Sequence, residues 1–168
     1  METDKVFGFV KPLVDVHTMG LYTMANLVRE CGYKAVIAPP EVNYALEHVQ
    51  KLNNYSLVKS WIANNNITHL CFSYRLDPND ACDYFMQLYE MLLGDNMTSA
   101  TGGTIQAFSF AGLPEACRLI AEKTQGNIIL FPGSETPMES LERYNIPQEK
   151  IRKSLIADSE YDNMRMAF

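Results

Sequence analysis

Short apolar segments alternate along the chain with longer segments in which apolar residues recur at helical spacing. The short segments have the length of buried strands, and they are 5–11 (KVFGFVK), 34–38 (KAVIA), 68–74 (THLCFSY), 104–110 (TIQAFSF) and 127–131 (NIILF). The segments with helical spacing are 20–31, 42–64 with a break near 53–54, 77–93, 114–124, 136–144 and 148–157. Strands that alternate with helices build a parallel sheet covered on both faces. The pattern therefore predicts an α/β fold: a single flavodoxin- or Rossmann-like domain with a doubly wound, five-stranded parallel sheet.

This α/β domain is expected to occupy residues 1–145. Its helix limits are marked by Gly32 after the first helix and by Pro78 and Pro114 in the first turns of two later ones. Residues 146–168 are then expected to form a C-terminal helix followed by a polar, methionine-rich tail, or a linker to a domain outside this chain.

The composition excludes several classes of function. The chain has a net charge of −6 and no cluster of Lys and Arg, whereas proteins that bind nucleic acid need a basic surface. Its apolar runs are shorter than the roughly 18 residues of a membrane-spanning helix. The acidic N-terminus does not have the pattern of a signal peptide. We therefore expect a cytoplasmic protein that binds neither nucleic acid nor a membrane.

The cysteines and two of the histidines do not form the patterns of metal sites. The cysteines are scattered, with no CxxC pair and no iron–sulfur spacing: they are Cys31, Cys71, Cys82 and Cys117. Buried thiols are the interpretation that this spacing favours. His48 lies in a helical stretch and is expected on a solvated face. His69 begins the third strand, at its amino end, away from the carboxyl ends of the strands where a ligand site is expected.

The expected topology locates the ligand site before any motif is considered. In open parallel sheets, ligands bind beyond the carboxyl ends of the strands, where the strand order reverses. The candidate residues should therefore lie in the loops that follow the first, third, fourth and fifth strands.

The loop after the first strand carries the most specific motif of the chain. It reads Asp15-Val16-His17-Thr18-Met19-Gly20, directly after a buried strand and directly before a helix. This sequence resembles the D-x-H-x-x-G signature of the cobalamin (vitamin B12)-binding domains found in B12-dependent methyltransferases, mutases and radical SAM proteins. The resemblance covers roughly residues 5–145.

The resemblance implies that a cobalamin binds "base-off/His-on". In this state the dimethylbenzimidazole base leaves the cobalt and enters a slot in the domain, and His17 becomes the metal ligand. A neutral imidazole is a good nitrogen ligand for a late first-row metal, and a carboxylate on its other ring nitrogen fixes the tautomer. Asp15 is expected to be that carboxylate, and Gly20 to open the helix beside the nucleotide tail of the cofactor without a steric clash.

The other three loops carry weaker matches to the family. After the third strand, Ser73 matches a serine that closes an Asp–His–Ser chain, although the Leu of the S-x-L motif arrives one position late, as Leu76. Ala111-Gly112 stands where the family usually has Gly-Gly. Phe131-Pro132-Gly133-Ser134 is similar to the F-G-P-G-T turn beside the dimethylbenzimidazole. All of these residues are predicted to bind the cofactor.

The resemblance implies a cobalamin-binding module with no catalytic residue of its own. The upper face of the corrinoid cofactor would be covered by a catalytic or capping domain or protein of a larger methyltransferase, mutase or radical SAM enzyme. Three alternatives stay open at this point: a stand-alone corrinoid protein that carries methyl groups, a B12-sensing regulatory module, and a flavodoxin-like domain that has lost the cofactor or binds a nucleotide. The nucleotide version has no G-x-G-x-x-G or P-loop pattern in its support.

Overall fold

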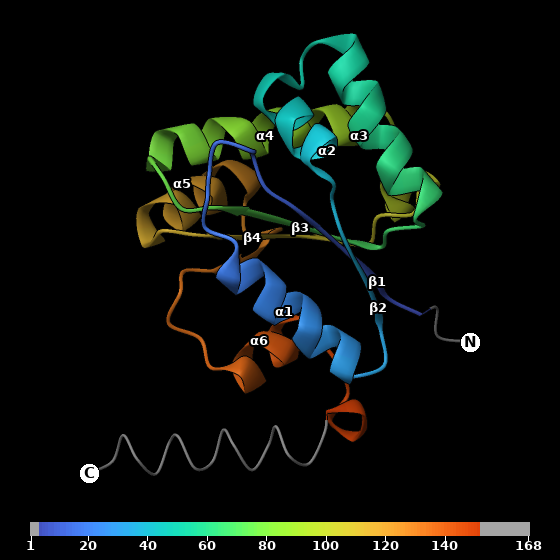
Figure 1. Cartoon of the computed structure of the whole chain (residues 1–168), viewed down its shortest axis with the longest axis vertical. Coiled ribbons are helices and arrows are strands. Elements are labelled where there is room, and N and C mark those ends of the chain that lie inside the picture. The colour runs from blue at the N-terminus through green and yellow to red at the C-terminus, as the bar shows by residue number, and fades with distance from the viewer. Residues whose placement is uncertain (1–3, 152–168) are drawn as a thin grey trace.

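The computed structural model describes residues 4–151 and contains one five-stranded, all-parallel sheet. Its strands pair in the order β2-β1-β3-β4-β5 (Figure 1). They are β1 (Val6–Val10), β2 (Lys34–Ile37), β3 (His69–Tyr74), β4 (Ala107–Gly112) and β5 (Ile129–Phe131). The predicted fold class, a single flavodoxin/Rossmann-like α/β domain, is confirmed.

Helices cover both faces of this sheet. Figure 1 shows α1 and α6 on one face and α2 to α5 on the other. The helices are α1 (Met19–Glu30), α2 (Pro40–Ala45), α3 (Leu52–Asn64), α4 (Pro78–Gly94), α5 (Pro114–Thr124) and α6 (Pro137–Arg143). Short 3-10 turns are η1 (Leu46–His48), η2 (Ser99–Thr101) and η3 (Gln148–Lys150). None of the helices in the described residues is long and apolar enough to cross a membrane.

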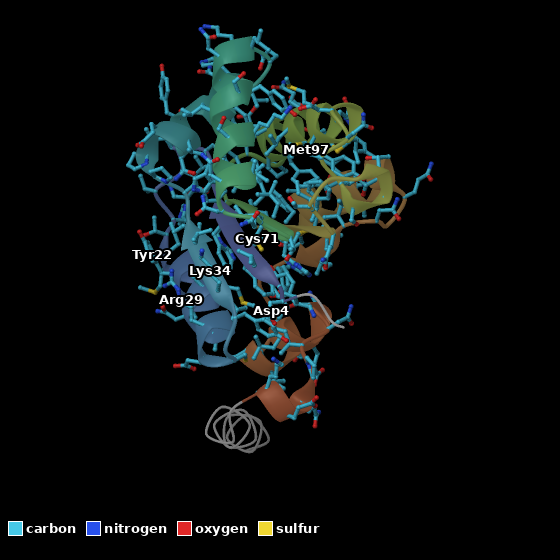
Figure 2. All side chains as sticks on the ribbon, turned by 90° about the vertical axis from the view of Figure 1, so that its right-hand side faces the viewer. Asp4, Tyr22, Arg29, Lys34, Cys71 and Met97 are labelled. Atoms are coloured by element: carbon cyan, nitrogen blue, oxygen red, sulfur yellow. The ribbon has the colours of Figure 1, made fainter. Side chains whose placement is uncertain are left out.

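The alternation of side chains along the strands divides the core into two layers. In β3, Leu70 and Phe72 pack into the layer under α2 to α5, whereas Cys71 packs into the layer under α1 and α6. Phe7 and Phe9 of β1 lie in the second layer together with buried residues of α1. In Figure 2, Cys71 lies inside the molecule, whereas Tyr22 and Arg29 lie toward its edge. The expectation for the cysteines is confirmed: all four are free and buried.

The start of α4 follows directly from its sequence. The Asp77 carboxylate accepts hydrogen bonds from the N–H groups of Asn79 and Asp80 at 2.8 and 3.1 Å, and Pro78 occupies the first turn, where an N–H is not needed. A similar arrangement of Thr136 and Pro137 begins α6.

The predicted division into a short helix and a longer one is confirmed, but the break lies a few residues before 53–54, since both asparagines lie inside α3. The chain instead leaves the helical conformation between η1 and α3, where Lys51 has an extended backbone. The Asn54 side chain donates a hydrogen bond to the carbonyl of His48 at 3.0 Å and so bridges this break. The Asn54 side chain thus supplies a donor to a carbonyl group at the end of the preceding turn, and it does not interrupt its own helix.

The remaining boundaries differ by a few residues. The fourth strand begins at Ala107 rather than at 104, since Ile105 forms an isolated bridge with Thr98 before the strand starts. Of the helix expected over 148–157, the described residues include only the turn η3. The rest of it, and the tail, lie outside the described residues.

The strand order places the reversal point between β1 and β3. The chain moves from β1 outward to β2, then crosses back to β3 on the other side of β1. The loops that leave β1 and β3 therefore separate toward opposite faces at this point, which is where flavodoxin-like sheets bind their ligands.

Candidate functional site

An aspartate–histidine pair lies in the loop between β1 and α1. The Asp15 side chain is fully buried, whereas the His17 side chain is 53% exposed. His17 Nδ1 lies 2.6 Å from Asp15 Oδ1, and the backbone N–H of His17 donates to the same oxygen at 3.0 Å. The imidazole is thus held at Nδ1, and Nε2, on the other side of the ring, has no hydrogen bond to any residue of 4–151.

The buried carboxylate is satisfied mainly by main-chain donors. Its second oxygen, Oδ2, accepts the backbone N–H of Arg75 at 2.6 Å, which ties the β1 loop to the β3 loop. Burial alone would raise the pKa of Asp15, but the hydrogen bonds from His17 and Arg75 outweigh burial, and the pKa lies below its usual value of 3.8. Asp15 is therefore ionised at neutral pH. The buried Lys11 ammonium also donates to the Asp15 carbonyl.

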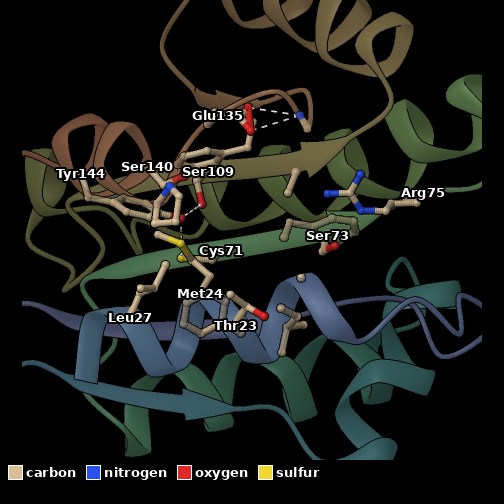
Figure 3. A pocket seen from close by; sticks show the side chains of 18 residues that line it. Thr23, Met24, Leu27, Cys71, Ser73, Arg75, Ser109, Glu135, Ser140 and Tyr144 are labelled. Atoms are coloured by element: carbon tan, nitrogen blue, oxygen red, sulfur yellow. Dashed lines mark hydrogen bonds between the residues drawn. The ribbon is translucent and has the colours of Figure 1, made fainter. Parts of the chain in front are cut away.

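A cavity of about 260 Å³ opens between α1 and the carboxyl ends of the strands (Figure 3). It belongs to the same edge of the sheet as the aspartate–histidine pair, because Arg75 both lines the cavity and bonds to Asp15. One wall is a single face of α1, on which Gly20, Thr23, Met24 and Leu27 recur at helical spacing. The remaining lining comes from Phe9, Leu21, Cys71, Phe72, Ser73, Arg75, Ser109, Ala111, Phe131, Gly133, Glu135, Pro137, Ser140 and Tyr144.

The inner end of the cavity holds a short chain of polar atoms. Ser109 Oγ and Tyr144 Oη lie 2.8 Å apart, and Tyr144 donates to Cys71 Sγ at 3.4 Å (Figure 3). Burial raises the pKa of Cys71 to about 11 and that of Tyr144 well above its usual value. Both groups are therefore protonated at neutral pH, and this end of the cavity is polar but uncharged.

The outer end of the cavity is charged. In Figure 3, Arg75 and Tyr144 lie at opposite ends. A methyl group built on Gly133 would lie 3.5 Å from Arg75 Nη1, and one built on Gly20 would lie 3.8 Å from Nη2. The guanidinium therefore lies between the start of α1 and the loop after β5. Glu135, whose side chain is 6% exposed, bonds to the Gly133 N–H and to Arg143.

The predicted site residues divide into four groups. Asp15 and His17 form the pair described above, and the cavity is lined by Gly20, Ser73, Ala111, Phe131 and Gly133. Val16, Thr18 and Met19 are exposed beside His17, with Val16 and Met19 at 80% and 83%. Outside the cavity lining are Leu76, Gly112, Pro132 and Ser134.

Two of the residues outside the lining have packing roles. Leu76 packs against the core layer under α2 to α5. A methyl group on Gly112 would lie 2.4 Å from the Tyr74 carbonyl oxygen, so the close approach of β4 to β3 requires glycine there. Ser73 lines the cavity without a hydrogen bond to Asp15, and the main chain of Arg75 provides the donor instead.

Sequence reasoning missed several residues of the cavity. Met24 and Leu27 share a helical face with Gly20, so periodicity from the motif glycine could have found them. Arg75 stands where the S-x-L pattern has its leucine, and that departure was a usable signal. Tyr144 carries no such signal, because only the packing of α6 brings it to Ser109 and Cys71.

Comparisons with known proteins add no family assignment. No protein-family model matches the chain, and no curated protein matches it. Within residues 4–151, no group of three or more His, Cys, Asp and Glu side chains could hold a metal ion.

Proposed function

We propose that this chain binds a cobalamin base-off/His-on, with His17 as the lower axial ligand of the cobalt. The observation that carries the proposal is the contact of 2.6 Å between His17 Nδ1 and the fully buried Asp15 carboxylate, next to a cavity at the reversal point of the sheet. When bound, the cofactor supplies a cobalt centre that can carry a methyl group or release an organic radical.

The donor set fits a metal that brings most of its own ligands. His17 is a single exposed imidazole with Nε2 available, and no cluster of ligating side chains accompanies it in the described residues. A corrin ring supplies four equatorial nitrogens, so one imidazole is all that the lower face of the cobalt needs. Donation of the Nδ1–H to Asp15 fixes the tautomer and makes Nε2 a stronger ligand.

The cavity fits the displaced base. An apolar cavity of about 150 Å³ is enough for benzene, and this one has about 260 Å³, room for a bicyclic aromatic ring such as dimethylbenzimidazole. Met24, Leu27 and Phe131 provide apolar walls, and Ser109 with Tyr144 provides hydroxyl groups at the inner end for a ring nitrogen.

The surface around His17 is consistent with a bulky apolar ligand. Val14, Val16 and Met19 lie within four residues of Asp15 in the chain, and each exposes half or more of its surface to water. Exposed apolar side chains this close together favour a site that is covered when its ligand is bound. We further propose that the opposite face of the cofactor is completed by another domain or protein, which would carry out the methyl transfer or the radical reaction.

The test is a titration of the purified protein with hydroxocobalamin, followed by visible absorption, in the wild type, His17→Ala and the control His48→Ala, which removes an exposed histidine on η1. We expect a saturable spectral shift in the wild type and in the control, and at least about a tenfold weaker affinity for His17→Ala. No saturable shift in the wild type, or an unchanged shift in His17→Ala, would contradict the proposal.

Electron paramagnetic resonance of the Co(II) form identifies the ligand atom directly. Nitrogen-14 bound axially splits each cobalt line into a triplet, and nitrogen-15 splits it into a doublet. Protein labelled with nitrogen-15 histidine should therefore give doublets with unlabelled cobalamin. Triplets would mean that the base of the cofactor, rather than a histidine, has stayed on the metal.

A further inference from the structure

Among residues 4–151, Arg75 is the one basic residue that lines the cavity. Its guanidinium lies at the outer end, between Gly20 at the start of α1 and Gly133 in the loop after β5. Both neighbours lack a side chain, so the space around the guanidinium is open to a ligand rather than filled by the protein.

The Arg75 guanidinium makes no hydrogen bond and no ion pair with the residues 4–151. Arg118 pairs with Glu115 and Glu122, and Arg143 pairs with Glu135. Glu135 is the acidic residue among the described residues that line the cavity. Its carboxylate oxygens accept hydrogen bonds from the Gly133 N–H and from the Arg143 guanidinium. Arg75 therefore holds five unused N–H donors at the entrance of a cavity, a setting that suits an oxyanion of a ligand.

We infer that Arg75 binds the phosphodiester of the nucleotide tail of the cofactor. This inference rests on the proposed function. The tail joins the corrin ring to the base through one phosphodiester, so a cobalt at His17 and a base inside the cavity require the tail to pass the entrance. The entrance is where the guanidinium lies, and a planar guanidinium matches two phosphate oxygens with parallel hydrogen bonds.

Arg75 also connects the tail to the metal ligand. Its backbone N–H holds Asp15 Oδ2 at 2.6 Å, while its side chain faces the cavity. The two functions belong to different atoms of one residue. A change of the side chain therefore removes the phosphate contact and leaves the main-chain bond to Asp15 in place.

The test compares three ligands on four proteins. Cobalamin has the complete tail, cobinamide phosphate has a phosphate but no ribose or base, and cobinamide has none of the three. The proteins are the wild type, Arg75→Gln, Arg75→Lys and the control Arg118→Gln, which removes an exposed positive charge on α5. Dissociation constants come from visible absorption, and circular dichroism verifies the fold of each variant.

Arg75→Gln should weaken the binding of cobalamin and cobinamide phosphate by about tenfold or more and leave cobinamide unchanged. Arg75→Lys should recover part of the loss, because it keeps the charge but not the planar fork. Arg118→Gln should bind all three ligands as the wild type does. Added salt should reduce the affinity of the wild type for cobalamin more than that of Arg75→Gln.

Two results would overturn the inference. Equal affinities of the wild type and Arg75→Gln for cobalamin would show that the guanidinium does not bind the tail, and the proposed function would stand if the nitrogen-15 doublets were present. An equal loss for all three ligands would show that Arg75 acts on His17 and not on the phosphate. Failure of the wild type to bind any of them would instead refute the proposed function itself.

Discussion

At the scale of single residues, Asp15 contributes both to the stability of the fold and to the geometry of the candidate site. Its carboxylate is fully buried and accepts hydrogen bonds from the backbone N–H groups of His17 and Arg75 and from the ring nitrogen of His17. A buried charge is tolerated only when such donors compensate for the lost water. The same bonds that stabilise the loop therefore fix the orientation of the imidazole.

Asp15→Asn should lower the free energy of unfolding by about 1–3 kcal/mol at neutral pH, because one carboxylate oxygen is replaced by an amide donor that faces another donor. The pKa of Asp15 is lowered in the folded state, so its contribution is present above the usual value of 3.8 and is lost as pH falls below it. Urea denaturation should show the difference between the wild type and Asp15→Asn shrinking below about pH 4. A constant difference would mean that Asp15 is not ionised in the fold.

The sequence was sufficient to find Asp15 and His17 but not the donor that completes their chain. A short motif records side chains, and Ser73 was therefore the expected partner. The partner in the structure is the main-chain N–H of Arg75, which any residue except proline could supply. A hydrogen bond of this kind depends on the path of the backbone, and the sequence does not reveal it.

At the scale of elements, α1 has one face in the cavity and the motif glycine at its start. A methyl group on Gly20 would meet only the Arg75 guanidinium, at an ordinary contact distance of 3.8 Å. Nothing in the packing of the protein therefore requires glycine at this position. The proposed ligand does, since it would occupy the same space.

Gly20→Ala should keep or raise the free energy of unfolding, by up to about 1 kcal/mol, because alanine favours the helix. It should nevertheless weaken cobalamin binding severalfold. Gly94→Ala is the matched control, because Gly94 ends α4 with open space around it, and it should leave binding unchanged. Chemical denaturation and spectral titration of both variants measure the two effects separately. Unchanged binding by Gly20→Ala would show that the ligand does not occupy this end of the cavity.

Gly112→Ala should behave in the opposite way to Gly20→Ala. The added methyl group would lie 2.4 Å from the Tyr74 carbonyl oxygen, so β3 and β4 would have to separate, at a cost of about 1–3 kcal/mol. Thermal denaturation should detect the loss. An unchanged melting temperature would show that packing does not require glycine at position 112, and the prediction that Gly112 binds the ligand would then stand.

The elements were largely predictable because buried strands and amphipathic helices carry strong local signals. α5 was predicted with its observed limits, since Pro114 begins it and its apolar period is regular. The interruption between α2 and α3 was placed a few residues too late, because an asparagine pair is an ordinary turn signal. Asn54 is used to satisfy the His48 carbonyl, and that contact belongs to the tertiary structure.

At the scale of the whole molecule, the two ends of the sheet carry different groups. The carboxyl ends of the strands carry the candidate site, whereas the amino end of β3 carries His69, which is 6% exposed. Its ring packs against that of Phe7, with 4.8 Å between the centroids and a tilt of 38° between the planes, and its Nδ1 lies 2.8 Å from Thr68 Oγ1. Burial, with a smaller effect of the nearby Lys5, lowers the pKa of His69 from 6.5 to about 4. A neutral imidazole is thus part of the core, at the amino end of β3.

This buried histidine should make the fold sensitive to mild acid. The unfolded chain takes up the proton near pH 6.5 and the folded chain only near pH 4, so stability is complete above pH 6.5 and is lost progressively toward pH 4. Between about pH 7 and about pH 4.5 the wild type should lose about 2–3 kcal/mol of unfolding free energy, since each unit of pKa difference corresponds to about 1.4 kcal/mol.

His69→Gln should lose much less over the same interval, and the exposed His48→Gln should lose as much as the wild type. Urea denaturation at both pH values measures these slopes, and equal slopes for all three proteins would mean that another group senses the acid. His69 does not line the cavity, although its ring lies 6.3 Å from that of Tyr144, which does. At neutral pH His69→Gln should therefore still bind cobalamin through His17, and a spectral titration of the variant checks this.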